Sequence, residues 1–225
     1  LYRYELVGTI MHAEHLEARY GIGPHTISVP RIKKADDIDP DTFDNGIDDD
    51  TFNKIIAILR LAVPYTGMIV STRETKTVRE KALHVGITQV SGGSKTSVGG
   101  YVKEETEEEN SAQFDVSDLR SLDEVVRWLM DMDYIPSFCT ACYRVGRVGA
   151  DFMKFCKNEE IHNFCQPNAL MTLKEYLTDY ASPQTKISGE RIIQKELETI
   201  DKPMLKEQVI KNLKNIEQGI RDYKF

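Results

Sequence analysis

Apolar residues recur at helical spacing in three segments of the first half of the chain, and short β-branched runs lie between them. This pattern predicts helices over 4–20, 50–62 and 75–85, and strands over 25–31, 67–73 and 87–91. Helices that alternate with strands are typical of a parallel α/β sheet, either open or closed into a barrel. Because three strands make an incomplete barrel and a small core, we expect the carboxyl-terminal part of a longer protein.

The second half of the chain is predicted to be mainly helical. Ser121 and Glu124 form a capping-box pattern at the start of a predicted helix over 121–133. Further helical stretches are expected near 168–180, 189–200 and 204–223. We therefore expect two domains, an α/β part over residues 1–112 and a helical part over residues 113–225.

Composition and charge argue against two classes of partner. The 225 residues are 40% hydrophobic and 29% charged, and the formal net charge is −7. Because Lys and Arg are scattered and form no basic stripe, we expect no nonspecific nucleic-acid binding. No apolar stretch approaches the ~18 residues that a membrane-spanning helix needs, and no signal peptide is recognised. We expect a cytoplasmic protein in a reducing setting, where structural disulfides are rare.

Three of the four cysteines have the spacing of a metal site. Cys139, Cys142 and Cys165 follow the pattern C-x2-C-x22-C, in which two thiolates can bind a soft metal centre from one turn and a third completes the rim. Three thiolates leave one metal atom of an iron–sulfur cluster open. The alternatives are small buried apolar residues, or a zinc site closed by His162. Cys156 lies in a predicted amphipathic helix, where packing is its expected role.

The carboxyl ends of the predicted strands select a second group of candidates, since parallel α/β sheets bind their ligands there. Arg31 closes the first predicted strand, where an arginine can clamp a carboxylate. Small or basic residues close the other two strands: Ser71, Thr72, Arg73, Ser91, Gly92, Gly93 and Ser94. The alternative is an ordinary salt bridge at a strand end. His25 lies at the opposite end of its strand. Its role is either that of an iron ligand or that of a residue at which the strand begins.

Four segments together resemble one enzyme family. They are Gly-Pro-His-Thr-Ile-Ser-Val-Pro-Arg (23–31), Ser-Thr-Arg-Glu (71–74), Gly-Gly-Ser-Lys-Thr-Ser-Val-Gly-Gly-Tyr (92–101) and Phe-Cys-Thr-Ala-Cys-Tyr-Arg (138–144). From Tyr2 to its last residue the chain resembles the radical S-adenosylmethionine tyrosine lyases that mature FeFe-hydrogenase. The cysteine pattern is the specific part, because the related 2-iminoacetate synthase of thiamine biosynthesis is similar through the barrel and lacks it.

The resemblance implies the carboxyl-terminal portion of a radical-SAM TIM-type barrel, followed by a mainly helical iron–sulfur domain. In that family, a radical formed from S-adenosylmethionine at one 4Fe–4S cluster splits tyrosine into p-cresol and dehydroglycine, which yields carbon monoxide and cyanide. These are thought to travel through the barrel to an auxiliary 4Fe–4S cluster that carries an extra iron (4Fe–5S type). An iron–carbonyl–cyanide–cysteine unit is assembled there. Tyrosine, cysteine and other hydrogenase maturation proteins are therefore the implied ligands and partners.

The resemblance also implies roles for individual residues. Cys139, Cys142 and Cys165 would bind the auxiliary cluster, and His25 would bind the extra iron. Contacts to S-adenosylmethionine or tyrosine are implied for Arg31, Ser71, Arg73, Ser91, Gly92 and Ser94. The C-x3-C-x2-C motif that holds the radical-generating cluster is absent, so we expect a fragment that does not cleave S-adenosylmethionine by itself. The alternatives are a non-catalytic iron–sulfur carrier or docking module and a zinc-stabilised structural domain.

Overall fold

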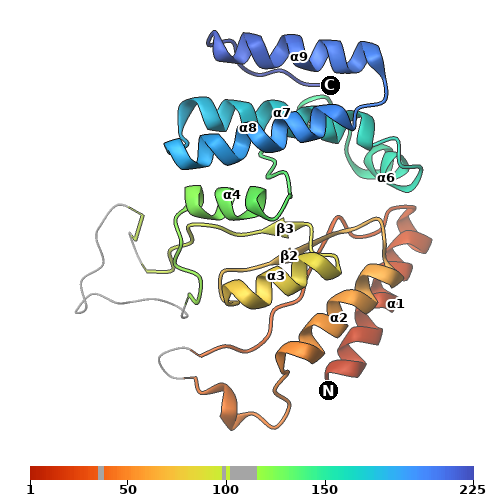
Figure 1. The fold of residues 1–225 in the computed structure, drawn as a ribbon. Coiled ribbons are helices and arrows are strands. Elements are labelled where there is room, and N and C mark those ends of the chain that lie inside the picture. The colour runs from red at the N-terminus through yellow and green to blue at the C-terminus, as the bar shows by residue number, and fades with distance from the viewer. Residues whose placement is uncertain (35–37, 98–99, 102–115) are drawn as a thin grey trace. The chain divides into compact units, whose positions relative to one another are not determined.

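The computed structural model describes residues 1–34, 38–97, 100–101 and 116–225, and the chain forms two compact units (Figure 1). The units are Leu1–Arg120 and Ser121–Phe225. The predicted domain boundary between residues 112 and 113 lies outside the described residues. Each unit has buried apolar side chains of its own.

The first unit contains a three-stranded parallel sheet in the order β1–β2–β3. Its elements are α1 (Tyr2–Tyr20), β1 (Thr26–Ser28), the 3-10 turn η1 (Pro40–Thr42), α2 (Asp49–Ala62), β2 (Gly67–Val70), α3 (Lys76–Val85) and β3 (Gln89–Val90). Ile27 pairs with Met68, and Ile69 pairs with Gln89. The strands are shorter than predicted, and β1 ends early because Pro30 has no N–H to donate to a ladder. The parallel α/β arrangement is thus confirmed, while three strands do not establish a barrel.

Side-chain caps fix where α2 and α3 begin. Asp48 accepts the N–H of Thr51 at 2.6 Å, and Thr75 accepts the N–H of Val78 at 3.4 Å. Such caps satisfy backbone donors that the first helical turn leaves without partners. The apolar faces of the two helices and the sheet then form the core of this unit, whose most buried members are Phe52, Ile56, Leu59, Met68, Val70, Val78 and Ala82.

The first helix, α1, differs from α2 and α3 because few of its side chains are fully buried. Ala13 is its one buried residue, whereas Val7 and Met11 are 55% and 62% exposed. The periodicity that predicted this helix is therefore confirmed for its backbone. Leu6, Ile10 and Leu16 are half-buried, and α1 contacts α2.

A buried ion pair holds the segment that follows the sheet. Arg79, which is 0% exposed, donates to the Asp118 carboxylate and to the carbonyl of Ser91, while the N–H of Asp118 donates to the carbonyl of Thr72 at 3.0 Å. Burial acts to raise the pKa of Asp118, but hydrogen bonds from Arg120 and the charge of Arg79 hold that pKa below its usual value. The pair therefore stabilises the fold above the usual aspartate pKa, and this contribution is lost as the pH falls.

We expect Asp118→Asn to destabilise the first unit by about 3–5 kcal/mol, because it leaves the buried Arg79 charge without its counterion. Urea unfolding followed by circular dichroism measures the change. Lys76→Gln is the matched control, since it removes the exposed Lys76–Glu80 pair at 3.5 Å, and such pairs contribute about 0.3–0.5 kcal/mol. Equal losses in the two variants would contradict a structural role for the buried pair.

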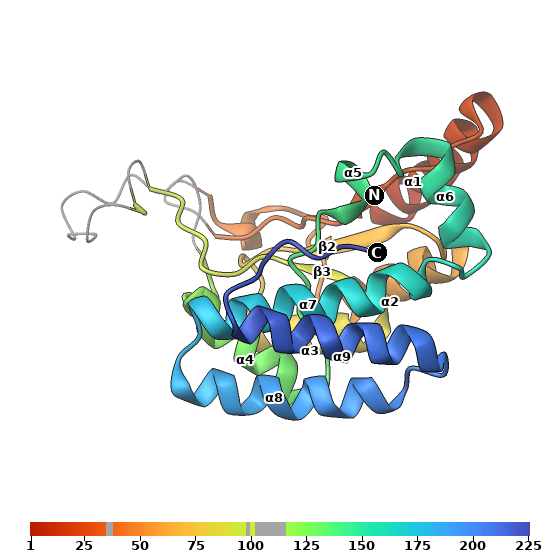
Figure 2. The same ribbon diagram turned by 90° about the horizontal axis from the view of Figure 1, so that it is seen from above.

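The regular elements of the second unit are all helices among the residues described: α4 (Leu122–Asp131), α5 (Ala141–Arg144), α6 (Gly149–Lys157), α7 (His162–Asp179), α8 (Pro183–Glu198) and α9 (Pro203–Glu217). Helix α7 packs against both α8 and α9, and α4 packs against α8 (Figure 2). The predicted capping box is confirmed. Ser121 accepts the N–H of Glu124 at 3.3 Å, and the Glu124 carboxylate accepts the N–H of Ser121 at 2.8 Å.

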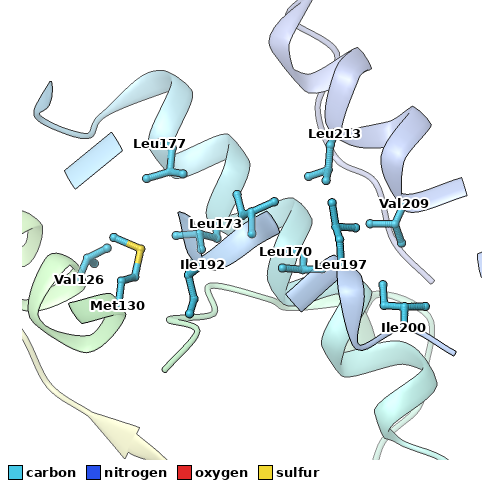
Figure 3. Close-up of a cluster of buried hydrophobic side chains, with 11 residues drawn as sticks. Val126, Met130, Leu170, Leu173, Leu177, Ile192, Leu197, Ile200, Val209 and Leu213 are labelled. Atoms are coloured by element: carbon cyan, nitrogen blue, oxygen red, sulfur yellow. The ribbon is translucent and has the colours of Figure 1, made fainter. Parts of the chain in front are cut away.

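A buried cluster of apolar side chains joins four of these helices (Figure 3). Its members are Val126, Met130, Leu170, Leu173, Leu177, Ile192, Ile193, Leu197, Ile200, Val209 and Leu213. Gly189 allows α8 to approach α7 closely, because a Cβ at this position would lie 2.3 Å from Cδ1 of Leu177. Helix α7 is therefore fixed by close packing along its length, which matters for the cysteine in its first turn.

Candidate metal centre

Cys139 and Cys142 lie on one turn of the chain after α4. Cys139 precedes α5, and Cys142 is the second residue of that short helix. The sulfur of Cys139 accepts the N–H of Ala141 at 3.4 Å, and the N–H of Cys139 donates to Ser137 Oγ at 3.3 Å. A backbone N–H donated to sulfur stabilises charge on a thiolate. This is the local geometry that a C-x2-C pair needs to bind one centre.

Cys165 lies in the first turn of α7. The predicted helix began at Asn168, whereas the observed helix begins at His162 and runs through Pro167. It begins early because a preceding turn leads directly into it: the N–H groups of Phe164 and Cys165 both donate to the carbonyl of Ile161, at 3.0 and 2.8 Å. The third cysteine is therefore carried by a packed helix.

None of the four cysteines is in a disulfide, and the other three all influence the thiol of Cys165. Burial and then the thiols of Cys142, Cys139 and Cys156 raise the pKa of Cys165 to about 11, and the charge of Arg147 acts in the opposite direction. The pKa of Cys156, in α6, is also raised by burial and by Cys142. The three predicted ligands and Cys156 therefore belong to one part of the second unit, and the influence of Cys142 on Cys156 goes beyond the packing role that its helix pattern predicts.

The spacing of these side chains bears on which metal they could hold. A single zinc ion with Zn–S bonds of about 2.3 Å would require its ligand atoms to lie roughly 4 Å apart. Among the described residues, no three His, Cys, Asp or Glu side chains form a group that could hold one metal ion. His162 is the exposed first residue of α7. The choice between a zinc ion and an iron–sulfur cluster stays a prediction.

Arg147 is a neighbour of the thiols that the sequence patterns did not single out. Its N–H donates to the carbonyl of Cys142 at 2.9 Å, and its guanidinium carbon lies 4.1 Å from the centre of the Phe164 ring. The signal that could have identified it is the pair of arginines, Arg144 and Arg147, directly after the C-x2-C turn. The charge of Arg147 favours the ionised form of the Cys165 thiol.

His25 lies in the first unit, directly before β1. The residue is exposed, its Nδ1 lies 3.0 Å from Thr26 Oγ1, and its carbonyl accepts the N–H of Gly67 at 3.0 Å. It therefore occupies the amino end of its strand, as predicted. Its role as an iron ligand stays a prediction.

Arg31 is engaged in an extensive ion pair at the carboxyl end of β1. Its Nε and Nη2 donate to the two carboxylate oxygens of Glu74 at 2.8 and 2.6 Å, Nη2 also donates to Asp49 at 2.5 Å, and Nη1 donates to the carbonyl of Ile47 at 2.9 Å. The guanidinium lies 4.7 Å from the centre of the Phe52 ring. This arrangement corresponds to the salt-bridge alternative, and contact with a ligand stays a prediction.

Three of the six residues with implied contacts to S-adenosylmethionine or tyrosine lie together. Arg31, Ser71 and Arg73 line one small cavity with Glu74, and Ser71 Oγ accepts the main-chain N–H of Arg73 at 3.3 Å. The other three, Ser91, Gly92 and Ser94, follow β3 and are not among the residues that line this cavity.

Comparison with known proteins identifies this architecture. Residues 28–135 match the family model described as the Biotin and Thiamin Synthesis associated domain. The whole chain superposes with a TM-score of 0.93 and 49% identity on a solved structure described as HydG, a maturase of the [FeFe]-hydrogenase. A second solved structure, the FeFe-hydrogenase maturase HydG from Carboxydothermus hydrogenoformans, matches 93% of the chain with a TM-score of 0.70 and 35% identity.

The chain is of the HydG type. It corresponds to the carboxyl-terminal part of HydG-type proteins and covers 48% and 44% of the two solved chains, so it spans about half their length. No curated protein matches the sequence significantly. None of the helices that the structure describes combines the length and the apolar character needed to cross a membrane.

Serine variants of the cysteines test which thiols bind metal in this HydG-type chain. We expect Cys139→Ser, Cys142→Ser and Cys165→Ser each to lower the affinity for iron at least about 10- to 100-fold. Loss of an outer-shell partner alone has an effect of this size, and these variants remove a predicted direct ligand. The measurement is iron and sulfide content after anaerobic reconstitution. Cys156→Ser is the matched control and should retain both, since Cys156 stands outside the C-x2-C-x22-C pattern. Equal losses in Cys156→Ser and Cys165→Ser would contradict the three-cysteine assignment.

Proposed function

We propose that this chain forms the part of a HydG-type maturase that binds an auxiliary iron–sulfur cluster, with Cys139, Cys142 and Cys165 as its protein ligands. The observation that supports the proposal is that Cys139 and Cys142, on the turn that leads into α5, both influence the thiol of Cys165 in the first turn of α7, within one unit. Soft thiolates suit iron–sulfur clusters. Three protein ligands leave one iron of a 4Fe–4S cluster available to an external group.

The same proposal gives His25 the role of binding an extra iron associated with that cluster. A neutral imidazole is a good iron ligand. The contact between His25 Nδ1 and Thr26 Oγ1 at 3.0 Å supports this role, because a second partner fixes the orientation and tautomer of a ligating ring. Its exposed position before β1 leaves the ring accessible to a metal.

In the complete protein, the proposed reaction is radical cleavage of tyrosine to p-cresol and dehydroglycine, and the onward formation of carbon monoxide and cyanide. S-adenosylmethionine and a second 4Fe–4S cluster supply the radical. This chain has no C-x3-C-x2-C motif, so the ligands of that second cluster would come from the remainder of the protein. The product fragments and free cysteine would meet at the auxiliary cluster, and other maturation proteins would receive the iron unit.

Residues at the carboxyl ends of the strands would contribute to the tyrosine and S-adenosylmethionine site. Ser71 and Arg73 line the small cavity there and are the more direct candidates, together with Ser91, Gly92 and Ser94 in the loop after β3. Arg31 would contribute chiefly by holding Glu74, because four hydrogen bonds already occupy its guanidinium.

Two histidine variants test the proposed metal assignments. If His25 binds the extra iron, His25→Ala should lower the iron content by one atom per chain while acid-labile sulfide stays unchanged. His162→Ala is the matched control and should leave iron and sulfide at the parental values. Anaerobic iron, sulfide and zinc analysis of the reconstituted chains measures both. Equal iron in His25→Ala and the parent would contradict the role of His25, and loss of bound zinc in His162→Ala would favour a zinc site.

A further inference from the structure

The two arginines that follow the C-x2-C turn have different surroundings. The Arg144 side chain is 44% exposed and pairs with Asp222, with Nη2 and Oδ2 2.6 Å apart. Arg147 is half-buried: its guanidinium lies over the Phe164 ring, and its Nη2 donates to the main-chain oxygen of Phe225. Both arginines therefore anchor the cysteine turn to the segment after α9, but only Arg147 turns inward.

One donor of Arg147 is not used by the protein. Its Nε is buried and has no hydrogen-bond partner among the described residues. Buried N–H groups in folded proteins are almost always paired, and the exceptions call for an explanation such as a bound group. A guanidinium stays protonated under all ordinary conditions. The Nε–H is therefore a permanent donor that the described part of the chain leaves available to a bound acceptor.

Three observations relate Arg147 to the proposed cluster ligands. Phe164, the ring beneath the guanidinium, is followed directly by Cys165. The N–H of Arg147 donates to the carbonyl of Cys142 at 2.9 Å. The charge of Arg147 also lowers the pKa of the Cys165 thiol, against the effects of burial and of the neighbouring thiols. Two of the three proposed cluster ligands are thus neighbours of Arg147.

We infer that Arg147 is a positioning residue for the iron–sulfur site, whose Nε–H donates to a sulfur of the bound cluster and whose charge stabilises the reduced cluster. The inference rests on the proposed function. Sulfide and thiolate sulfurs are anionic acceptors, and hydrogen bonds to them are among the factors that set a cluster's reduction potential. The Phe164 ring and the Phe225 carbonyl hold the guanidinium in place, so little reorganisation is needed when the cluster binds.

The test is the midpoint potential of the reconstituted cluster in the full chain, from a redox titration followed by electron paramagnetic resonance. Arg147→Gln removes the charge and the Nε donor. We expect it to lower the ratio of reduced to oxidised cluster about tenfold at a fixed potential, a shift of 59 mV for a one-electron couple. Arg147→Lys keeps the charge without the planar donor, and an intermediate shift is expected. Arg144→Gln is the matched control and should keep the parental potential.

Cluster content is measured in each sample, so that failure of the role of Arg147 can be distinguished from failure of the proposed function. Parental potentials in Arg147→Gln and Arg147→Lys, with full iron and sulfide, would overturn the role of Arg147 and leave the proposed function intact. An equal shift in Arg144→Gln would also overturn it, because charge loss anywhere on the turn would then suffice. If Arg147→Gln holds no cluster, the midpoint potential of Arg147→Lys is compared with that of the parent. A parental potential then overturns the role of Arg147, and a lower potential supports it. A parent chain without iron and sulfide contradicts the proposed function, and the inference fails with it.

Discussion

The packing of α7 is the constraint on which the candidate site depends, because one helix carries both Cys165 and the centre of the unit's core. Leu170 and Leu173 are 0% exposed, and they lie within eight residues of the cysteine. Gly189 removes the side chain that would otherwise keep α8 away from this helix. Interiors packed this closely do not deform gradually. The third thiol is therefore held in position by apolar packing, and the C-x2-C turn must be brought to it.

The segment after α9 supplies that second constraint. It runs along α7: Arg221 donates to Asp179 at 2.9 and 2.6 Å, and Phe225 exchanges main-chain hydrogen bonds with the Asn168 side chain, the shorter at 2.9 Å. Arg144 and Arg147 join the cysteine turn to the same segment. Burial and mutual proximity both disfavour thiolates in the absence of metal. Cluster binding would reverse this balance, since it deprotonates its ligands and so couples the site's stability to its metal.

Much of the fold could be predicted from local sequence signals, and the exceptions have physical causes. The Ser121 capping box and the alternation of helices and strands were read correctly because they depend on neighbouring residues. The start of α7 was predicted too late. A turn in which N–H groups donate to the carbonyl of Ile161 leads directly into the helix, before Pro167. The spacing of the cysteines selects three thiols that the structure places in one unit, and their role as ligands stays a prediction. That spacing could not predict the contacts of Arg147 or the four hydrogen bonds of Arg31, because these partners are distant in sequence and only the folded chain brings them together.

The measurement that tests the central claim most directly is the metal and sulfide content of the anaerobically reconstituted chain, together with the electron paramagnetic resonance spectrum of the reduced sample. The account predicts about four irons or more per chain, matching sulfide, and a signal typical of a reduced 4Fe cluster. About one zinc per chain without iron would contradict it and would assign the cysteines to a structural site.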